Sequence, residues 1–423
     1  MTEVGELGEA AGEFPGGFDP RMIEEARDLV AEVAVRTPVI ESRWLSGLLG
    51  RPVWLKCENL QRTGSFKVRG SAVRIARLGA EERERGVVAA SAGNHAQGVA
   101  LAAQQHGIDA CVFMPDGAPI NKERATRGYG AEVVFAGPTL EDALAAAEER
   151  VADTGATLIH PFDHPDIVAG QGTVGLEILE QVPDVGSILV PTGGGGLLGG
   201  IAAAVHHRRR DVKVHGVQAA AAAAFPASLA AGHPIRLAEM ATMADGIAVG
   251  RPGVLTLPLV QAYVDGLAMV SEEALSRALL ALVEREKLVV EPAGAAAAAA
   301  LGAWAEGSLD ADLELPPGPV VVLLSGGNVD PLLLGKVIRH GLSAAGRYLT
   351  LEVKIPDLPG GLARLLGEVA DAGANVLEVV HERTTPGLHL DEVEVHLQLE
   401  TRGNEHAAAV VERLRRHGFV TGG

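Results

Sequence analysis

Short apolar segments alternate with helical patterns from Arg51 to about Phe162, and this alternation constrains the fold more than any other feature of the chain. A strand, a helix and a further strand in regular succession form βαβ units, whose strands pair in a parallel sheet. The predicted strands cover Val87–Ala90, Ala110–Met114, Glu132–Phe135 and Thr157–Ile159, and the predicted helices run from the glycine turn to Ala103, over Asn121–Gly128 and over Leu140–Val151.

A second alternating set follows, with strands at Ser187–Val190, Val212–Val217 and Val320–Leu324. Uninterrupted apolar strands are typical of a sheet that helices cover on both faces. We therefore expect an α/β region of two open parallel sheets over residues 19–342, with a smaller subdomain at about 60–155 inserted in the larger one. Residues 1–18, acidic and rich in glycine, are expected to form a flexible tail.

The pattern changes after about Leu342, where Ser343–Gly346 is expected to be a linker. Residues 347–423 then show the order strand, helix, strand, strand, helix, with a further strand at Phe419. This order, with the turn Asp357–Gly360 and the segment Ala372–Asn375, resembles the ferredoxin-like ACT regulatory module. The resemblance implies that an amino-acid effector binds near Asp357–Gly361, beside Asn375.

The length, charge and cysteine content of the chain limit the classes of partner and site that it can have. The chain has 423 residues, a length typical of two or three domains. Its formal net charge is −18, which argues against binding to nucleic acids or anionic membranes, because phosphate groups require basic patches. The two cysteines, Cys57 and Cys111, lie in apolar runs and suggest neither disulfides nor a metal site. No secretory signal or membrane-spanning run is visible, so we expect a cytoplasmic protein.

Four short segments carry the chemistry. They are Thr63-Gly-Ser-Phe-Lys67-Val-Arg-Gly70, Ser91-Ala-Gly-Asn94-His-Ala-Gln-Gly98, Gly193–Leu197 and Ser325-Gly-Gly-Asn328. In this order they resemble the threonine and serine dehydratase family, which are fold-type II enzymes dependent on pyridoxal 5'-phosphate. The resemblance covers about Thr37 to Arg339.

Lys67 stands where a helix is expected to begin. A lysine that forms an imine must lose its proton, and desolvation together with the positive end of a helix dipole disfavours the charged form. A surface lysine is the alternative for any isolated residue of this type. The resemblance implies that Lys67 binds the cofactor covalently and then acts as the catalytic base, with Phe66 beside it at the cofactor.

The glycines Gly193, Gly194, Gly195 and Gly196 follow a strand and open a helix, and backbone N–H groups at such a helix start bind phosphate. The resemblance assigns this phosphate to the cofactor, with Leu197 completing the turn. A dinucleotide site is the rival interpretation, but it would require a carboxylate after the next strand, where the chain has Val217 and Gln218. A purely structural turn is a third possibility.

The remaining roles come from the resemblance. Asn94 is expected to donate a hydrogen bond to the cofactor's phenolic oxygen, and Ser325 to face its pyridine nitrogen. Ser91, Gly93 and Asn94 are expected to bind the substrate carboxylate. His95 is interpreted as a residue that positions the loop. A hydroxyl at Ser325 cannot keep the pyridine nitrogen protonated, which favours elimination over transamination.

Three further segments bear on function. Ala92 stands where serine racemases of this fold carry a serine acid/base group, so racemisation is disfavoured. Asp245 resembles a residue of a site-lining loop, although Asp-Gly is also an ordinary turn. The segment Glu291–Ala295 resembles the family's helix start near the cofactor, and a helix cap is the alternative role for Glu291.

We therefore expect an ammonia-lyase acting on L-threonine and also on L-serine, without a bound metal and assembled as a homo-oligomer. The alternatives are a serine racemase and serine dehydratase of the same fold, or a non-catalytic amino-acid sensor. Retention of Lys67, Asn94 and Ser325 together argues against the sensor.

Overall fold

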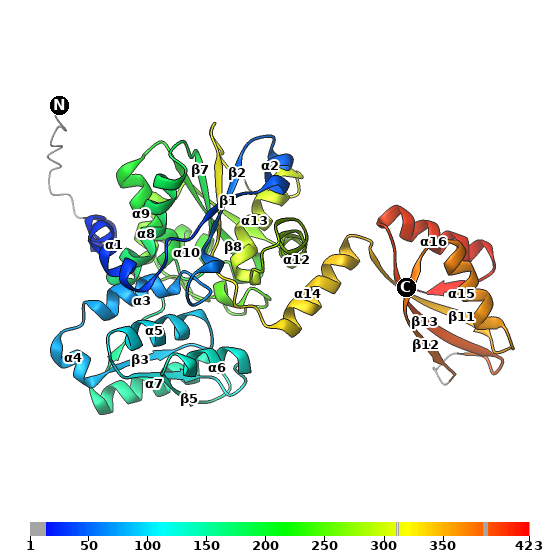
Figure 1. Ribbon diagram of the computed structural model, residues 1–423, viewed down its shortest axis with the longest axis horizontal. Helices are drawn as coiled ribbons and strands as arrows, with labels where there is room; N and C mark the ends of the chain where they lie inside the picture. The colour runs from blue at the N-terminus through cyan, green and yellow to red at the C-terminus, as the bar shows by residue number, and fades with distance from the viewer. Residues whose placement is uncertain (1–13, 310, 312, 384–387, 423) are drawn as a thin grey trace. The chain divides into compact units, whose positions relative to one another are not determined.

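A computed structural model describes residues 14–309, 311, 313–383 and 388–422. The chain divides into two compact units, Met1–Asp330 and Pro331–Gly423 (Figure 1). The division falls before helix α14 (Pro331–Ala344), because this helix contacts strand β11 (Tyr348–Pro356) of the second unit. The sequence had instead suggested a boundary at residue 342. The predicted linker at 343–346 is therefore helical at Ser343 and Ala344.

The first unit contains a six-stranded sheet in the order β1-β2-β10-β7-β8-β9. All neighbours pair in parallel except β1 and β2, which are antiparallel. The predicted strands β7, β8 and β10 are confirmed, whereas β1 and β9 were not predicted. The bounds are β1 (Val39–Glu41), β2 (Val53–Cys57), β7 (Ser187–Pro191), β8 (Lys213–Ala219), β9 (Gly266–Val270) and β10 (Val320–Leu324).

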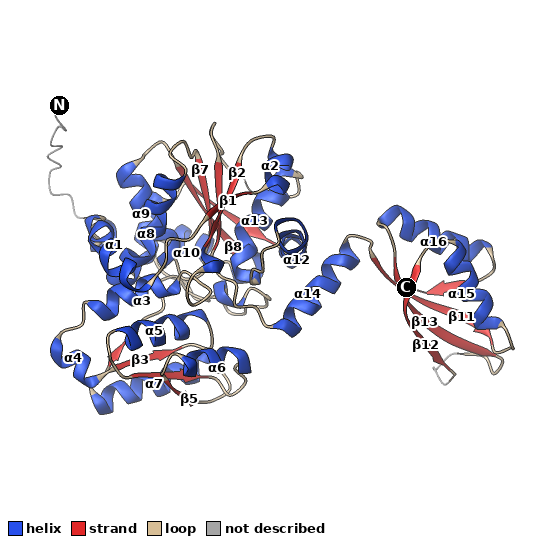
Figure 2. Ribbon diagram, viewed as in Figure 1, coloured by secondary structure: helices blue, strands red, loops and turns tan. Residues whose placement is uncertain are grey.

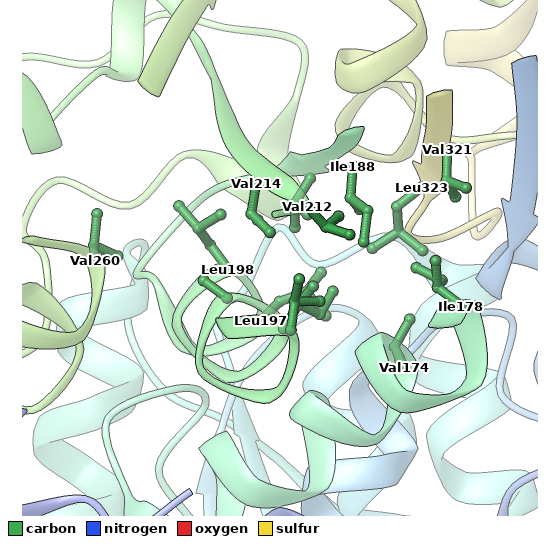
Figure 3. Packing of buried hydrophobic residues seen from close by; sticks show 14 of the residues in the cluster. Val174, Ile178, Ile188, Leu197, Leu198, Val212, Val214, Val260, Val321 and Leu323 are labelled. Carbon is green, nitrogen blue, oxygen red and sulfur yellow. The ribbon is translucent and has the colours of Figure 1, made fainter. Parts of the chain in front are cut away.

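Helices cover both faces of this sheet (Figure 2). Helices α8 (Pro165–Gln181) and α9 (Gly196–Arg208) lie on one face, and α13 (Pro292–Ala305) and α12 (Glu272–Ala281) lie on the other. Burial on both faces explains why the strands are apolar throughout. Figure 3 shows the core on the α8 and α9 face, formed by Val174, Ile178, Leu197 and Leu198 of the helices and Ile188, Val214, Val321 and Leu323 of the strands.

A second, four-stranded parallel sheet has the order β5-β4-β3-β6. Alternate side chains point to opposite faces of a strand. Val88 and Cys111 accordingly pack against α7, while Val112 packs against α5. The predicted βαβ units are therefore confirmed. The bounds are β3 (Val87–Ala90), β4 (Ala110–Met114), β5 (Glu132–Phe135), β6 (Thr157–Leu158), α5 (Asn94–Gln105), α6 (Ile120–Gly128) and α7 (Leu140–Thr154).

The remaining helices complete the first unit, and among the described residues no helix is both long and apolar enough to span a membrane. Of the predicted tail, residues 1–13 lie outside the described part of the chain. Phe18 does not belong to a tail, because its side chain is fully buried in the core. The bounds are α1 (Arg21–Val33), α2 (Arg43–Leu49), α3 (Lys67–Ala76), α4 (Ala80–Arg85), α10 (Phe225–Ala231) and α11 (Thr256–Tyr263).

The second unit contains an antiparallel sheet in the order β12-β13-β11-β14, packed against helices α15 and α16. Alternation of buried and exposed residues along β11 gives this sheet one apolar face. The predicted order of elements is confirmed, including the last strand. The bounds are α15 (Gly361–Asp371), β12 (Asn375–Glu382), β13 (Glu392–Glu400), α16 (Asn404–Arg416) and β14 (Val420–Gly422).

Candidate active site

Lys67 is the first residue of α3, and the turn before it is tied to the end of β10. The backbone N–H of Phe66 donates to the carbonyl oxygen of Ser325 at 3.2 Å, and Ser65 pairs with Gly326 in an isolated bridge. Gly64 adopts a φ of 73°, in the left-handed region that favours glycine. The first and fourth segments therefore meet at the carboxyl end of β10, where open α/β sheets bind ligands.

The amine of Lys67 lies in a poorly solvated place. Desolvation lowers the pKa of Lys67 to about 8, and the charge of Glu291 opposes that shift. Its Nζ donates to the carbonyl oxygen of Pro161 at 2.9 Å. At pH 7 roughly a tenth of this amine is therefore unprotonated, far more than of a free lysine, and the unprotonated form is the one that a nucleophile or base requires.

Asn94 begins α5 directly after the turn that follows β3. Its Nδ2 donates to Oε1 of Glu291 at 2.6 Å, and its Oδ1 accepts from Nδ2 of Asn328 at 2.8 Å. Helix α5 also packs closely on the lysine segment, since a Cβ at Gly98 would lie 3.1 Å from the carbonyl carbon of Lys67. The second segment thus contacts the first and the fourth.

Ser91 and Gly93 lie in the turn between β3 and α5, and both are partly exposed. The backbone N–H of Gly93 donates to Oγ of Ser91 at 3.1 Å. The neighbouring His95 is buried, and its Nε2 lies 2.7 Å from the carbonyl oxygen of Ile159. Burial lowers the pKa of His95 to about 3, so its ring is neutral and its geometry suits positioning of the loop.

The glycine turn between β7 and α9 is packed too tightly for side chains. A Cβ at Gly194 would lie 2.5 Å from the ring of Phe162, and one at Gly195, where φ is 95°, would lie 2.6 Å from Phe225. Oγ1 of Thr256 also donates to the carbonyl oxygen of Gly194 at 2.6 Å. A fixed turn whose backbone N–H groups begin a helix can bind a phosphate.

Two predicted site residues, Leu197 and Phe66, have side chains that pack in or against the hydrophobic core, and Leu197 is the more buried of the two. Leu197 lies in the hydrophobic core (Figure 3), so only its backbone N–H is available to a ligand. Ser325 is buried, 4% exposed, directly after β10. The segment that carries Pro161 and Phe162 links the amine of Lys67 to the glycine turn, and the four segments therefore form one site.

Sequence reasoning did not assign the role of Glu291. Glu291 occupies the N-cap position of α13, but its side chain makes no capping hydrogen bond there. The carboxyl group instead accepts a hydrogen bond from Asn94, and the residue is 3% exposed. Burial, with the charge of Asp245, raises the pKa of Glu291 to about 7. A glutamate between the apolar Val289–Val290 and a proline was the signal available in the sequence.

Asn328 and Lys122 were also missed. Asn328 had been quoted as part of its segment without a role. Lys122 of α6 is buried, and its Nζ lies 2.8 Å from Oδ2 of Asp245. This ion pair joins α6 to the loop between α10 and α11, and the charge of Asp245 acts on Glu291, so Asp245 lies beside the site.

Comparisons with known proteins agree with this geometry. Residues 30–326 match the family described as pyridoxal-phosphate dependent enzyme, and residues 349–418 match the ACT domain. An L-threonine ammonia-lyase of Geobacter sulfurreducens is 46% identical over 399 residues, which cover 94% of this chain and 98% of the relative. An L-threonine ammonia-lyase of Thermotoga maritima is 44% identical, covering 94% of this chain and 97% of the relative.

Solved structures show the same similarity for the first unit. A threonine deaminase from the organism abbreviated T.th. superposes with a TM-score of 0.68 at 43% identity, covering 73% of this chain and 98% of that chain. Maize serine racemase superposes with a TM-score of 0.70 at 35% identity, covering 77% of this chain and 98% of that chain. The chain therefore belongs to the family of pyridoxal-phosphate dependent enzymes and carries an ACT domain after its catalytic region.

Proposed function

We propose that this chain is an ammonia-lyase that converts L-threonine to 2-oxobutanoate and ammonia, and L-serine to pyruvate and ammonia. The observation that carries the proposal is the position of the Lys67 amine, which has a lowered pKa and lies in one site with Asn94, Ser325 and the glycine turn. The relatives named L-threonine ammonia-lyase, similar over almost the whole chain, support this choice of substrate.

The residues of this site fit pyridoxal phosphate. The turn Gly193–Gly196 and the N–H of Leu197 would hold the phosphate, as a helix start freed of side chains does. Asn94 would donate to the phenolic oxygen and Ser325 would face the pyridine nitrogen, with Phe66 beside the ring. When bound, the cofactor withdraws electrons from the substrate's Cα and so makes the Cα proton acidic.

The protein's own groups then direct the reaction. Ser91 and the backbone N–H of Asn94 would bind the substrate carboxylate in the partly exposed turn before α5, and the N–H of Gly93 would join them by giving up its bond to Oγ of Ser91. The unprotonated amine of Lys67 would accept the Cα proton, since its pKa of about 8 matches a base working near neutral pH. Loss of the β-hydroxyl as water, followed by hydrolysis, accounts for the keto acid and ammonia.

A kinetic panel tests this function. The purified enzyme is offered L-threonine, L-serine and their D-isomers, and 2-oxobutanoate, pyruvate and inverted amino acid are measured. We expect keto acid from the L-isomers. Inverted serine in excess of pyruvate would contradict the proposal and favour the racemase alternative, which the similarity to maize serine racemase supports and Ala92 opposes. If the protein forms neither keto acid nor inverted amino acid, the result would favour the amino-acid sensor.

The ACT domain indicates amino-acid binding, and we propose that an amino-acid effector binds within the second unit. A cavity of about 590 Å³ is lined by the turn after β11 and the end of β12, with Asp357, Gly360, Leu366, His381 and Arg383 among its residues. The expected position near Asp357–Gly361 agrees with this cavity. Asn375 does not line it, because Asn375 begins β12 whereas His381 lies near the other end of that strand. We also propose that the protein is a cytoplasmic homo-oligomer.

A further inference from the structure

A chain of three hydrogen bonds links Asn94 to two residues for which no role has been assigned. Nδ2 of Asn328 donates to the carbonyl oxygen of Thr63 at 2.6 Å and to Oδ1 of Asn94 at 2.8 Å. Nδ2 of Asn94 donates in turn to Oε1 of Glu291 at 2.6 Å. The chain joins residues that are 197 to 265 positions apart in the sequence.

The direction of this chain is fixed at one end by the backbone. A peptide carbonyl can only accept, so the group of Asn328 that faces Thr63 must be its NH₂. Both hydrogens of that NH₂ are then donated, and the atom of Asn94 that faces it must be the oxygen. The NH₂ of Asn94 consequently points to Glu291, and one of its two hydrogens remains available to another acceptor.

At the other end of this series of hydrogen bonds, Glu291 can accept a hydrogen bond from Asn94 in either protonation state. A carboxylate accepts on both oxygens, and a carboxylic acid still accepts on the oxygen without the proton. The pKa of Glu291 is raised to about 7 by burial and by the charge of Asp245, while Lys122, the hydrogen bond from Asn94 and Lys67 oppose this shift. The direction of the hydrogen bonds therefore does not change when Glu291 titrates.

Two glycines leave room for the side chains that form this series of hydrogen bonds. A Cβ at Gly326 would lie 2.2 Å from Oε1 of Glu291 and 3.1 Å from Nδ2 of Asn94. A Cβ at Gly64 would lie 2.3 Å from Oδ1 of Asn328. The first and fourth segments thus need glycine where the amide and carboxyl groups of the chain pass, which ties the sequence motifs to this hydrogen-bond arrangement.

We infer that Asn328 and Glu291 are positioning residues that hold the Asn94 amide with its NH₂ directed to the cofactor's phenolic oxygen. The inference rests on the proposed function, in which Asn94 donates to that oxygen. A side-chain amide can rotate so that its oxygen and its NH₂ exchange positions. The rotated amide of Asn94 would place its oxygen, an acceptor, against the phenolic oxygen, which is also an acceptor. The two flanking residues prevent that exchange.

The test compares cofactor binding and cofactor absorbance across matched variants. Asn328→Asp replaces the donor by acceptors, so Asn94 is expected to turn its NH₂ toward the new carboxylate and lose its bond to the cofactor. Glu291→Gln keeps an acceptor oxygen, whereas Glu291→Ala removes it. Asn121→Asp and Glu123→Gln on α6 are the controls, because Asn121 is exposed and Glu123 pairs with Arg127 of the same helix.

Each purified apoprotein is titrated with pyridoxal phosphate, and its circular dichroism is recorded to show that it is folded. We expect Asn328→Asp and Glu291→Ala to weaken binding by about tenfold or more, the equivalent of one hydrogen bond to a charged group. Both should also shift the visible absorbance maximum, because the phenolic oxygen loses a donor. Glu291→Gln should bind within about threefold of wild type with an unshifted maximum, like the controls.

Wild-type binding and absorbance in Asn328→Asp would overturn the inference, and so would equal damage in Glu291→Gln and Glu291→Ala. If Asn328→Asp is unfolded, the two Glu291 variants still decide the matter. The proposed function fails separately if the wild-type protein takes up no pyridoxal phosphate, a result that would remove the inference with it. If wild type binds the cofactor and the variants behave like it, only the inference fails.

Discussion

The side-chain amine of Lys67 lies 2.9 Å from the carbonyl oxygen of Pro161 and donates a hydrogen bond to it. A neutral amine and a charged ammonium can both make this bond, so the carbonyl holds the nitrogen in place without requiring its charge. Desolvation lowers the pKa of Lys67 to about 8, although the negative charge of Glu291 opposes the shift. The arrangement keeps the nitrogen oriented and partly unprotonated.

The rate at which apoprotein takes up pyridoxal phosphate should therefore rise with pH around a midpoint near 8. Only the unprotonated amine attacks an aldehyde, and the unprotonated fraction increases as pH passes the pKa. Stopped-flow absorbance from pH 6 to about 11 measures this rate, and a free lysine derivative, whose pKa is about 10.4, is the control. A midpoint equal to that of the free amine would show that the site does not lower the pKa.

Gly194→Ala should damage the glycine turn, because the added Cβ would lie 2.5 Å from the ring of Phe162. Overpacking of this kind costs about 1–3 kcal/mol. We expect weaker cofactor binding and a lower thermal midpoint. The matched control is Gly47→Ala in α2, where nothing lies within 4 Å of the added Cβ. That variant should gain about 0.5–1 kcal/mol, since alanine favours a helix. Equal effects of the two substitutions would refute the role of close packing.

Ser325→Asp should change which products form. Ser325 is buried directly after β10, so a carboxylate there would be desolvated, and beside the proposed position of the pyridine nitrogen it would favour protonation of that nitrogen. A protonated ring stabilises the carbanion for longer, which increases racemised and transaminated by-products relative to keto acid. Chromatography of the reaction mixture gives this ratio, with Ser325→Ala as the control. An unchanged ratio in a variant that still binds cofactor would count against the electronic argument.

The effector site can be tested through Arg383. Its Nε lies 3.0 Å from Oδ2 of Asp357 at the cavity, and both residues are exposed enough to exchange this partner for the charged ends of an amino acid. Calorimetry on the full chain should detect binding of isoleucine, valine, threonine or serine, and Arg383→Ala should weaken it by about tenfold. Arg402→Ala, which lies outside the cavity lining, should bind as wild type does. Binding unaffected by Arg383→Ala would place the effector elsewhere.

Periodicity was sufficient for elements whose own residues determine them. Strands such as Val87–Ala90 and Val320–Leu324 were predicted because continuous apolar runs need burial on both faces. Strand β1 (Val39–Glu41) was not, since three residues, of which one is partly exposed and two are exposed, give no periodic signal and form a strand only by pairing with β2. The helical nature of Ser343 was missed because small residues favour linker and helix alike.

The candidate site likewise contains residues that the sequence could identify and contacts that it could not. The motifs could identify Lys67, Asn94 and the glycine turn, because each is embedded in a local pattern of recognisable residues. The contact between Asn94 and Glu291 could not be predicted, since the two residues are 197 positions apart and meet only in the folded structure. The inward turn of Leu197 depends likewise on the core that α9 and the large sheet build together.

Turnover of L-threonine by Lys67→Ala tests the central claim most directly. Lys67 is proposed to bind the cofactor and to accept the Cα proton, so its loss removes both contributions. The measurement is 2-oxobutanoate released by wild type and variant at saturating cofactor, with the visible absorbance of the lysine-bound cofactor recorded in parallel. We predict that the band disappears and that turnover falls by about 10³-fold or more. Release of 2-oxobutanoate within tenfold of wild type would contradict the account.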